Sequence, residues 1–253
     1  TQFAGYDHLH LGRKLIELFD SHGKGVHTLE SHQEGYALFD VTPFYAESGG
    51  QVGDQGTIHN PTVHAKVIAT FKVAKQIVHK IHVEKGLLEN QKPYTLDVDP
   101  ISRRQTAVNH TATHMLHAAL RKTLGERIKQ AGSLVDSNRL RFDFTYPRAL
   151  TPEELTTVET LVNVQIEKQF PVTVKEMNYD EAIKKGALAF FDEKYGERVR
   201  VVRVGDSQGD FSVELCGGTH LQNISDIGVL KILSESSVAS GVRRIEAITS
   251  NKA

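Results

Sequence analysis

The chain has 253 residues, of which 39% are hydrophobic, enough for one large domain or two modest ones with cores of their own. The formal net charge of -1 excludes a strongly basic protein, so a nucleic-acid partner would need a local basic patch. No apolar run approaches the length of about 18 residues that a membrane helix needs, and we expect no membrane partner. A single cysteine excludes an internal disulfide framework and suits a reducing cytosol, so we expect a cytoplasmic location.

The first part of the chain, residues 1–97, has the pattern of a β-rich domain. Short apolar runs at residues 36–41, 64–71 and 76–83 are bounded by turn signals rich in glycine, asparagine and proline. Short strands at this spacing predict a small barrel or sandwich.

The second part, residues 98–253, begins with a helical pattern. Asp99 is a favourable capping residue, Pro100 suits the first turn of a helix, and Gly125 is expected to end it. We therefore predict a helix between Asp99 and Gly125.

Further helices and then strands follow. Thr151 and Glu154 have the spacing of a capping box, which predicts a second helix that Pro171 ends. A short third helix is expected over residues 179–185. The remaining apolar runs have the composition of strands: residues 172–174, 198–204, 211–215, 227–233 and 242–248. Helices followed by strands, without strict alternation, predict an α+β domain with helices packed on an antiparallel sheet, after a small β-barrel-like N-terminal domain.

His110 and His114 are four residues apart in the first predicted helix, so their imidazoles would share one face and could hold one metal ion. With 13 histidines in the chain, this spacing alone means little. A helical projection puts the apolar stripe through Ala112 and Met115 on nearly the opposite side. A core role for the two histidines is therefore not expected, and a solvated surface is the alternative to a metal site.

The only cysteine provides the stronger signal. Cys216 and His220 are also four residues apart, a coincidence with a chance of about one in twenty. Gly217 and Gly218 between them let the backbone turn sharply after a strand. Two ligands from a helix and two from a turn make a tetrahedral set of three histidines and one cysteine, which favours Zn²⁺ over Mg²⁺ or Ca²⁺. The alternative is a buried, inert cysteine near an unrelated histidine.

The paired signature His110-x3-His114 and Cys216-x3-His220 resembles that of the alanyl-tRNA synthetase editing domain and its free-standing relatives. The stretch Thr-Pro-Phe-Tyr-Ala-Glu-Ser-Gly-Gly-Gln is closer to this family than to the related domain of threonyl-tRNA synthetase. Other matching segments are residues 42–54, 132–135, 140–144 and 241–247. Because Thr1 replaces an initiator Met and residues 5–7 are similar to the stretch after the aminoacylation module, we expect an internal piece of a synthetase.

The resemblance implies a function as well as a fold. It implies hydrolysis of the ester in Ser-tRNA(Ala) and Gly-tRNA(Ala), with Ala-tRNA(Ala) spared, and partnership with the remaining modules of the synthetase. Thr113 and Gln130 correspond to family positions that shape the editing pocket. We expect them to bind the serine hydroxyl, with Thr111 as a further candidate. A site that bonds this hydroxyl rejects alanine because its polar groups are left unpaired, at about 1–3 kcal/mol each.

Contacts to tRNA and the source of the catalytic base are less constrained. The turn of Ser48, Gly49 and Gly50 either approaches the terminal adenosine or only forms a hairpin. Candidate phosphate contacts, with ordinary solvated charges as the alternative, are Arg103, Arg121, Lys122, Arg243 and Arg244. Glu47 and Glu214 are candidate bases, and the sequence does not choose between them.

Two other functions fit the same residues. The chain could be a non-catalytic, zinc-stabilised tRNA-binding module, since four protein ligands fill a tetrahedral zinc shell. It could also be a free-standing trans-editing deacylase, which the absence of an initiator Met disfavours.

Overall fold

The computed structural model describes residues 1–189 and 196–249. The chain divides into two compact units, and three residues interrupt the simple order of the sequence. The first unit comprises Thr1–Ser48 and Val52–Arg103, and the second comprises Gly49–Gln51 and Arg104–Ala253. None of the described helices has the length and apolar character that crossing a membrane requires.

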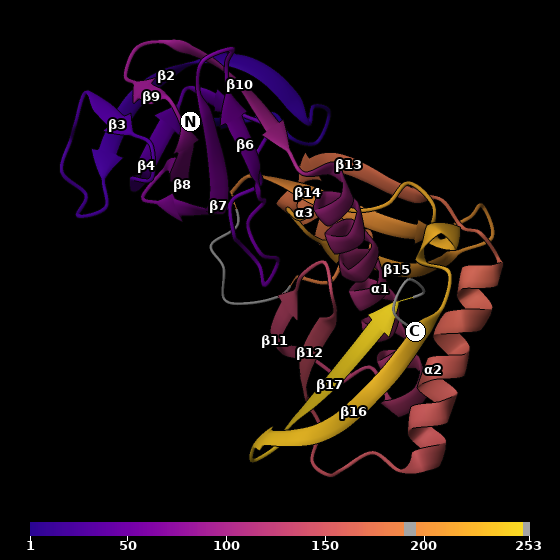
Figure 1. The fold of residues 1–253 in the computed structure, drawn as a ribbon. Coiled ribbons are helices and arrows are strands. Elements are labelled where there is room, and N and C mark those ends of the chain that lie inside the picture. The colour runs from indigo at the N-terminus through magenta and orange to yellow at the C-terminus, as the bar shows by residue number, and fades with distance from the viewer. Residues whose placement is uncertain (190–195, 250–253) are drawn as a thin grey trace. The chain divides into compact units, whose positions relative to one another are not determined.

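The first unit is built around a closed barrel (Figure 1). Its six strands are antiparallel, and their order is β10 (Pro93–Val98), β2 (His10–Asp20), β4 (Glu34–Phe39), β8 (Gln76–Lys85), β7 (His64–Val73) and β6 (Gly56–His59). Two small ladders lie outside it: β1 (Gln2–Phe3) with β5 (Val41–Thr42), and β3 (Thr28–Glu30) with β9 (Leu87–Glu89). The predicted barrel-like domain is confirmed.

Alternation of buried and exposed residues explains which strands the sequence reveals. Along β4 every second side chain is buried, as expected for a strand with one face on a core. Strand β2 escaped prediction because a register shift between Leu15 and Glu17 interrupts its alternation. The barrel interior is filled by apolar side chains, among them Leu15, Leu18, Phe39, Ile58, Ile81 and Leu96.

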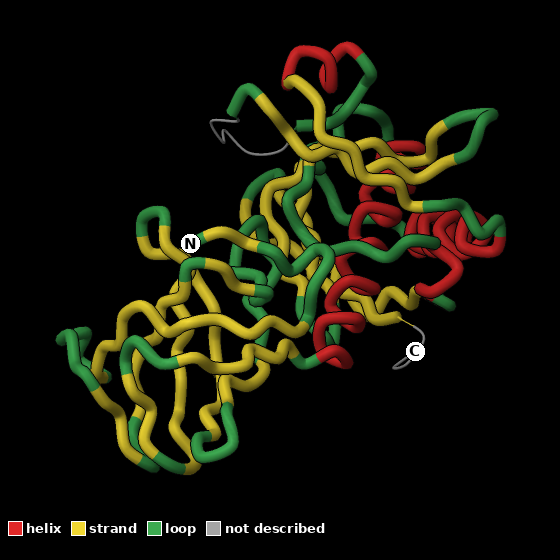
Figure 2. The backbone as a smooth tube through the Cα atoms, turned by 90° about the horizontal axis from the view of Figure 1, so that it is seen from above, coloured by secondary structure: helices red, strands yellow, loops and turns green. Residues whose placement is uncertain are grey.

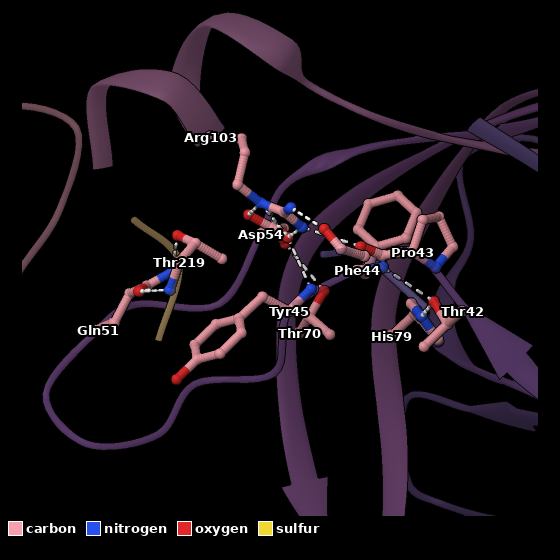
Figure 3. A network of polar contacts seen from close by, with 11 residues as sticks. Thr42, Pro43, Phe44, Tyr45, Gln51, Asp54, Thr70, His79, Arg103 and Thr219 are labelled. Carbon is pink, nitrogen blue, oxygen red and sulfur yellow. Dashed lines mark hydrogen bonds and ion pairs between the residues drawn. The ribbon is translucent and has the colours of Figure 1, made fainter. Parts of the chain in front are cut away.

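A buried ion pair crosses the first unit (Figure 3). The Nε atom of Arg103 donates to both carboxylate oxygens of Asp54 at 2.9 and 3.0 Å. The two other guanidinium nitrogens donate to the carbonyl oxygens of Gly5 at 2.6 Å and Pro43 at 2.9 Å. Asp54 also accepts from the backbone N–H of Tyr45 at 2.6 Å. One buried charge pair thus ties together several segments of this unit.

The helices begin where the sequence predicts. Helix α1 covers Pro100–Leu124, and Asp99 caps it by accepting from the N–H groups of Ile101 and Ser102 at 2.9 and 3.1 Å. Helix α2 covers Pro152–Glu167, and its capping box between Thr151 and Glu154 is confirmed. Helix α3 covers Tyr179–Lys184. Figure 2 shows the first unit as strands and loops, with the helices starting at α1.

The strands of the second unit form two antiparallel sheets. One has the order β11 (Gln130–Val135), β12 (Leu140–Thr145), β17 (Val242–Thr249) and β16 (Leu230–Ala239). The other has the order β13 (Val172–Asn178), β14 (Arg198–Gly205) and β15 (Asp210–Leu215). The α+β class is confirmed, although sequence patterns did not reveal that the strands divide between two sheets.

One predicted strand begins later than expected. Residues 227–233 were expected to be extended, but the 3₁₀ helix η1 (Ile224–Ile227) occupies their start. The side chain of Asn223 accepts from the N–H of Ser225 at 2.8 Å, and Gly228, with a φ of 73°, ends the turn. Local side-chain capping thus competes with the strand.

Helix α1 is buried on every side in its middle, where all residues from Thr106 to Leu120 are buried. Its apolar residues, such as Met115 and Leu116, join a cluster that also contains residues of α2 and of both sheets. The expectation that His110 and His114 lie outside the core is therefore wrong. The helical projection assumed one covered face, whereas this helix is enclosed by protein all round.

We predict that His79, inside the barrel unit, stays neutral in mildly acidic solution. Its Nδ1–H donates to the carbonyl of Ala37 at 2.9 Å, and its Nε2 lies 2.7 Å from the hydroxyl of Thr42. Burial lowers the pKa of His79 from 6.5 to about 4. Below pH 6.5 the unfolded chain therefore binds a proton that the folded chain refuses, so stability falls as the pH drops toward 4, by about 3 kcal/mol in all.

An NMR titration of the His79 ring measures this directly. The ring signals should not move until the pH nears 4, and the same titration in denaturant supplies the reference for the unfolded chain. A midpoint for His79 near 6.5 would contradict the buried, neutral assignment.

We also predict that Arg103→Met lowers the free energy of unfolding by about 3–5 kcal/mol, because it leaves the Asp54 carboxylate buried without its cation. The neighbouring substitution Arg104→Met is the control. Arg104 pairs with Asp226 at 3.3 Å on the surface, so its loss should cost under about 1 kcal/mol. Urea unfolding followed by circular dichroism compares the two, and equal effects would refute the structural role of Arg103.

Candidate metal centre

The structure brings together the four side chains of the paired signature. Each of His110, His114, Cys216 and His220 offers one ligand atom, and these atoms all lie within 4.8 Å of one another. The Sγ atom of Cys216 is 3.4 Å from Nε2 of His110 and 3.3 Å from Nε2 of His220. Two of the ligands come from α1 and two from the turn that follows β15.

A glycine makes this approach of helix and turn possible. A Cβ atom on Gly218 would lie 2.1 Å from Cε1 of His110, which no side chain can tolerate. Arg200 on β14 fixes the same turn by donating to the carbonyl oxygens of Cys216 at 3.0 Å and Gly218 at 2.7 Å. The absence of a side chain at Gly218 thus lets the turn lie against the imidazole of His110, and the guanidinium of Arg200 holds the turn there.

The hydrogen bonds of Thr111 define the tautomer of His220. The Thr111 hydroxyl donates its only proton to the carbonyl of Ala107 at 2.9 Å and accepts from the N–H of Leu221 at 3.1 Å. Nδ1 of His220, which is 3.2 Å from this hydroxyl, must therefore be the donor. The bare Nε2 of His220 is then left on the side of Cys216.

A buried carboxylate lies beside Nδ1 of His114. Glu214, the penultimate residue of β15, has an oxygen 3.2 Å from Nδ1 of His114, and its other oxygen accepts from Nδ1 of His117 at 2.9 Å. Burial alone would raise the pKa of Glu214, but the imidazoles of His114 and His117 and the cation of Arg121 together hold it below its usual value. A carboxylate that accepts the Nδ1 proton orients the ring of a metal-binding histidine.

Electrostatics favour neutral imidazoles at this centre. Burial lowers the pKa of His110 and His220 well below 6.5, and the other histidines of the group and Arg200 lower it further. Burial also lowers the pKa of His114, an effect that Glu214 partly opposes. Neutral imidazoles are the form that binds a metal ion.

The other predicted pocket residues lie on α1 and on β11. Thr113 is buried next to His114, and its hydroxyl donates to the carbonyl of Asn109 at 2.8 Å, which leaves its lone pairs as acceptors. Gln130 begins β11 and is partly buried, and among the described residues its side-chain amide forms no hydrogen bond. The hydroxyl of Thr111 is fully used by its contacts to Ala107, Leu221 and His220.

Most of the basic residues proposed as phosphate contacts already have partners in the protein. Arg103 is buried with Asp54, which argues against a phosphate contact. Arg121 donates to the carbonyl oxygens of Glu126 and Ile128. Arg243 pairs with Glu235, and Arg244 pairs with Asp143 at 2.7 Å. Lys122 is exposed, with its ammonium 5.5 Å from the ring centre of Phe211.

The turn of Ser48, Gly49 and Gly50 is divided between the units. Ser48 and Glu47 belong to the first unit, where the Ser48 carbonyl accepts from the Tyr45 hydroxyl at 3.2 Å. Gly49 and Gly50 belong to the second unit, and the carbonyl of Gly50 accepts from the N–H of Val135 at 2.8 Å. The glycines therefore allow the backbone of this turn to approach strand β11 closely.

Sequence reasoning missed two residues of this centre, Gln51 and Arg200, and named Glu214 only as a candidate base. Gln51 lies next to the Ser-Gly-Gly turn, and its side chain contacts His110. Their positions in the sequence carry no signal, because only the fold brings them to the ligands.

Comparison with known proteins places these features in a class. Residues 1–101 match the family model for class II (A) tRNA synthetases, and residues 199–246 match the threonyl and alanyl tRNA synthetase second additional domain. The second match includes both ligands of the turn, Cys216 and His220. In these two stretches the chain is similar to class II tRNA synthetases.

The individual relatives are alanine–tRNA ligases, which confirms the resemblance found in the sequence. The chain is 46% identical over 249 residues to the alanine–tRNA ligase of Thermoanaerobacter pseudethanolicus, and 49% identical over 249 residues to that of Pseudomonas fluorescens. It is 48% identical over 250 residues to that of Nitratidesulfovibrio vulgaris. Each match covers 98% of this chain, and the chain spans 28% of the length of each relative.

We predict that Gly218→Ala weakens Zn²⁺ binding about tenfold or more, because the new methyl group displaces His110 from the centre. Gly217→Ala is the matched control, since a Cβ atom at Gly217 meets nothing within 4 Å. Competition with a chromophoric chelator measures both affinities. Equal affinities in the two variants would show that the close contact between Gly218 and His110 is not needed for the centre.

Proposed function

We propose that the second unit is an editing site that hydrolyses the ester of alanine tRNA mischarged with serine or glycine. The observation that carries the proposal is the group of His110, His114, Cys216 and His220, two buried and two half-buried, in a chain similar to alanine–tRNA ligases. The match to the second additional domain, which covers two of these ligands, supports it.

The residues of this group fit zinc. Three imidazoles and one thiol supply the nitrogen and sulfur donors that zinc prefers, whereas Mg²⁺ and Ca²⁺ require oxygen ligands. The contact of Nδ1 of His220 with Thr111 leaves a bare Nε2 on the side of Cys216, and the Glu214 carboxylate lies 3.2 Å from Nδ1 of His114. When bound, Zn²⁺ would supply a Lewis acid that attracts the polar atoms of an aminoacyl ester.

The number of ligands limits the chemistry of the site. Four protein ligands fill a tetrahedral shell, and such closed sets are typical of zinc with a structural role. We therefore assign to this centre the orientation of the aminoacyl end of the tRNA, and we assign no general base. An ester is a labile substrate, for which correct positioning can supply much of the rate.

Selectivity for serine would come from hydrogen bonding. Thr113 keeps acceptor capacity on its hydroxyl, and Gln130 offers both a donor and an acceptor. Alanine has no hydroxyl to satisfy such groups, so its ester would bind less well in the same place. Thr111 is a weaker candidate, because its proton and lone pairs are already engaged.

The closed ligand set also favours a second candidate function, a zinc-stabilised tRNA-binding module without catalysis. In that case zinc would contribute to folding, and its removal would unfold the second unit cooperatively. A variant that lacks a zinc ligand but keeps its fold therefore distinguishes the two functions, because only an editing site would lose activity in it.

We predict that the 253-residue chain, loaded with zinc, releases serine from Ser-tRNA(Ala) about 10- to 100-fold faster than it releases alanine from Ala-tRNA(Ala). Cys216→Ala should lower the rate about 100-fold or more by displacing the substrate. The assay is single-turnover release of labelled amino acid at high protein concentration, with and without a chelator.

Circular dichroism of the same Cys216→Ala sample is the control for folding. Lost activity with a retained fold supports the editing site, whereas global unfolding supports the stabilising module. A folded, zinc-loaded wild-type chain that releases no serine above the uncatalysed rate would exclude the proposed deacylase.

A further inference from the structure

The side chain of Gln51 is fully buried and bonds to two segments of the second unit. Its Oε1 accepts from the backbone N–H of Thr219 at 2.9 Å, and its Nε2 donates to the Thr219 hydroxyl at 2.9 Å. Figure 3 shows this pair of contacts. A backbone N–H can only donate, so the contact to Thr219 defines which end of the amide is the oxygen.

This orientation decides the tautomer of His110. Nδ1 of His110 lies 2.7 Å from the same Oε1 of Gln51, and two acceptors cannot share a hydrogen bond without a proton. Nδ1 of His110 must therefore carry the proton and donate it to Gln51. The ring is left with a bare Nε2, which is the atom 3.4 Å from Sγ of Cys216.

The glycines before Gln51 explain how its side chain reaches this place. Gly49 and Gly50 have φ values of 58° and 83°, in the left-handed region that favours glycine. A Cβ atom on Gly50 would lie 2.6 Å from the carbonyl oxygen of Ser133. Gln51 itself pairs with Val135 in a parallel bridge. The two glycines thus allow the backbone to lie directly against β11. The side chain of Gln51 is thereby placed beside His110.

We propose that Gln51 is a positioning residue for the metal centre, which holds His110 in the one tautomer and ring orientation that can bind zinc. This gives the Ser-Gly-Gly-Gln motif a role in the second unit that differs from a contact with the terminal adenosine. The inference rests on the proposed zinc site for its effect on metal affinity. The tautomer of His110 does not depend on that proposal.

The rest of the centre supports this role. Thr111 acts in the same way on His220, and a carboxylate oxygen of Glu214 lies 3.2 Å from Nδ1 of His114. Gln51 lies 59 residues before His110 in the sequence. Outer partners of this kind change metal affinity by about 10- to 100-fold when they are removed.

The test compares Gln51→Met, which has a similar shape but no acceptor, with Gln51→Glu, which keeps an acceptor oxygen. Gln165→Met is the matched control, because Gln165 is a buried glutamine of α2 and, in the described part of the chain, its side chain forms no hydrogen bond with the four side chains of the centre. The first readout is the ¹⁵N spectrum of the metal-free histidines, which distinguishes a protonated from a bare ring nitrogen. The second readout is zinc affinity by chelator competition.

In the wild type and in Gln51→Glu and Gln165→Met, we expect His110 to carry its proton on Nδ1. In Gln51→Met, we expect this preference to be lost and zinc affinity to fall about 10- to 100-fold. Gln51→Glu should bind zinc at least as well as the wild type. If Gln51→Met does not fold, the shorter amide of Gln51→Asn withdraws the acceptor, and the same loss is expected.

Two results would overturn the inference. An unchanged tautomer and zinc affinity in a folded Gln51→Met or Gln51→Asn would show that Gln51 does not position His110. An equal loss in Gln51→Met and Gln51→Glu would assign Gln51 to packing alone. A wild-type chain that binds no zinc would refute the proposed function, while the ¹⁵N spectra would still decide the role of Gln51.

Discussion

Enclosure of α1 is the constraint on which the second unit depends. From Thr106 to Leu120 this helix has no face in solvent, yet it carries several polar side chains. A buried polar group without a partner costs about 1–3 kcal/mol, so each of them selects a neighbour. Asn109 illustrates this, because it donates to the carbonyl of Asp136 and accepts from the hydroxyl of Thr249.

The metal ligands follow the same rule with a difference. His110 and His220 each satisfy Nδ1 with a hydrogen bond to a protein partner and turn Nε2 toward Cys216, while Nδ1 of His114 lies 3.2 Å from the Glu214 carboxylate. Burial keeps the imidazoles neutral, and a group of neutral nitrogens beside a thiol is an incomplete polar cluster until a cation joins it. The proposed zinc would complete the cluster, which gives the ion a structural value in addition to any part in hydrolysis.

In the first unit, a buried ion pair satisfies the buried polar groups. Arg103 and Asp54 are buried together, and the remaining donors of the guanidinium bind carbonyl oxygens. Such pairs gain little net stability over apolar packing, but the loss of one partner is costly. Arg103 is thereby committed to the fold, which shows that a basic residue is not by itself a tRNA contact.

The sequence by itself determined many local elements and the candidate ligands. Caps at Asp99 and Thr151 defined two helices, apolar runs between turn signals indicated β4, β7 and β8, and the spacing of Cys216 and His220 indicated a metal site, because all of these depend on residues close together in the chain. Only the tertiary structure decided that α1 is enclosed, that the strands form two sheets, and that Gln51, Glu214 and Arg200 serve the centre. These facts depend on contacts between residues 16 or more positions apart, or on how strands pair, and spacing along the chain does not encode such contacts.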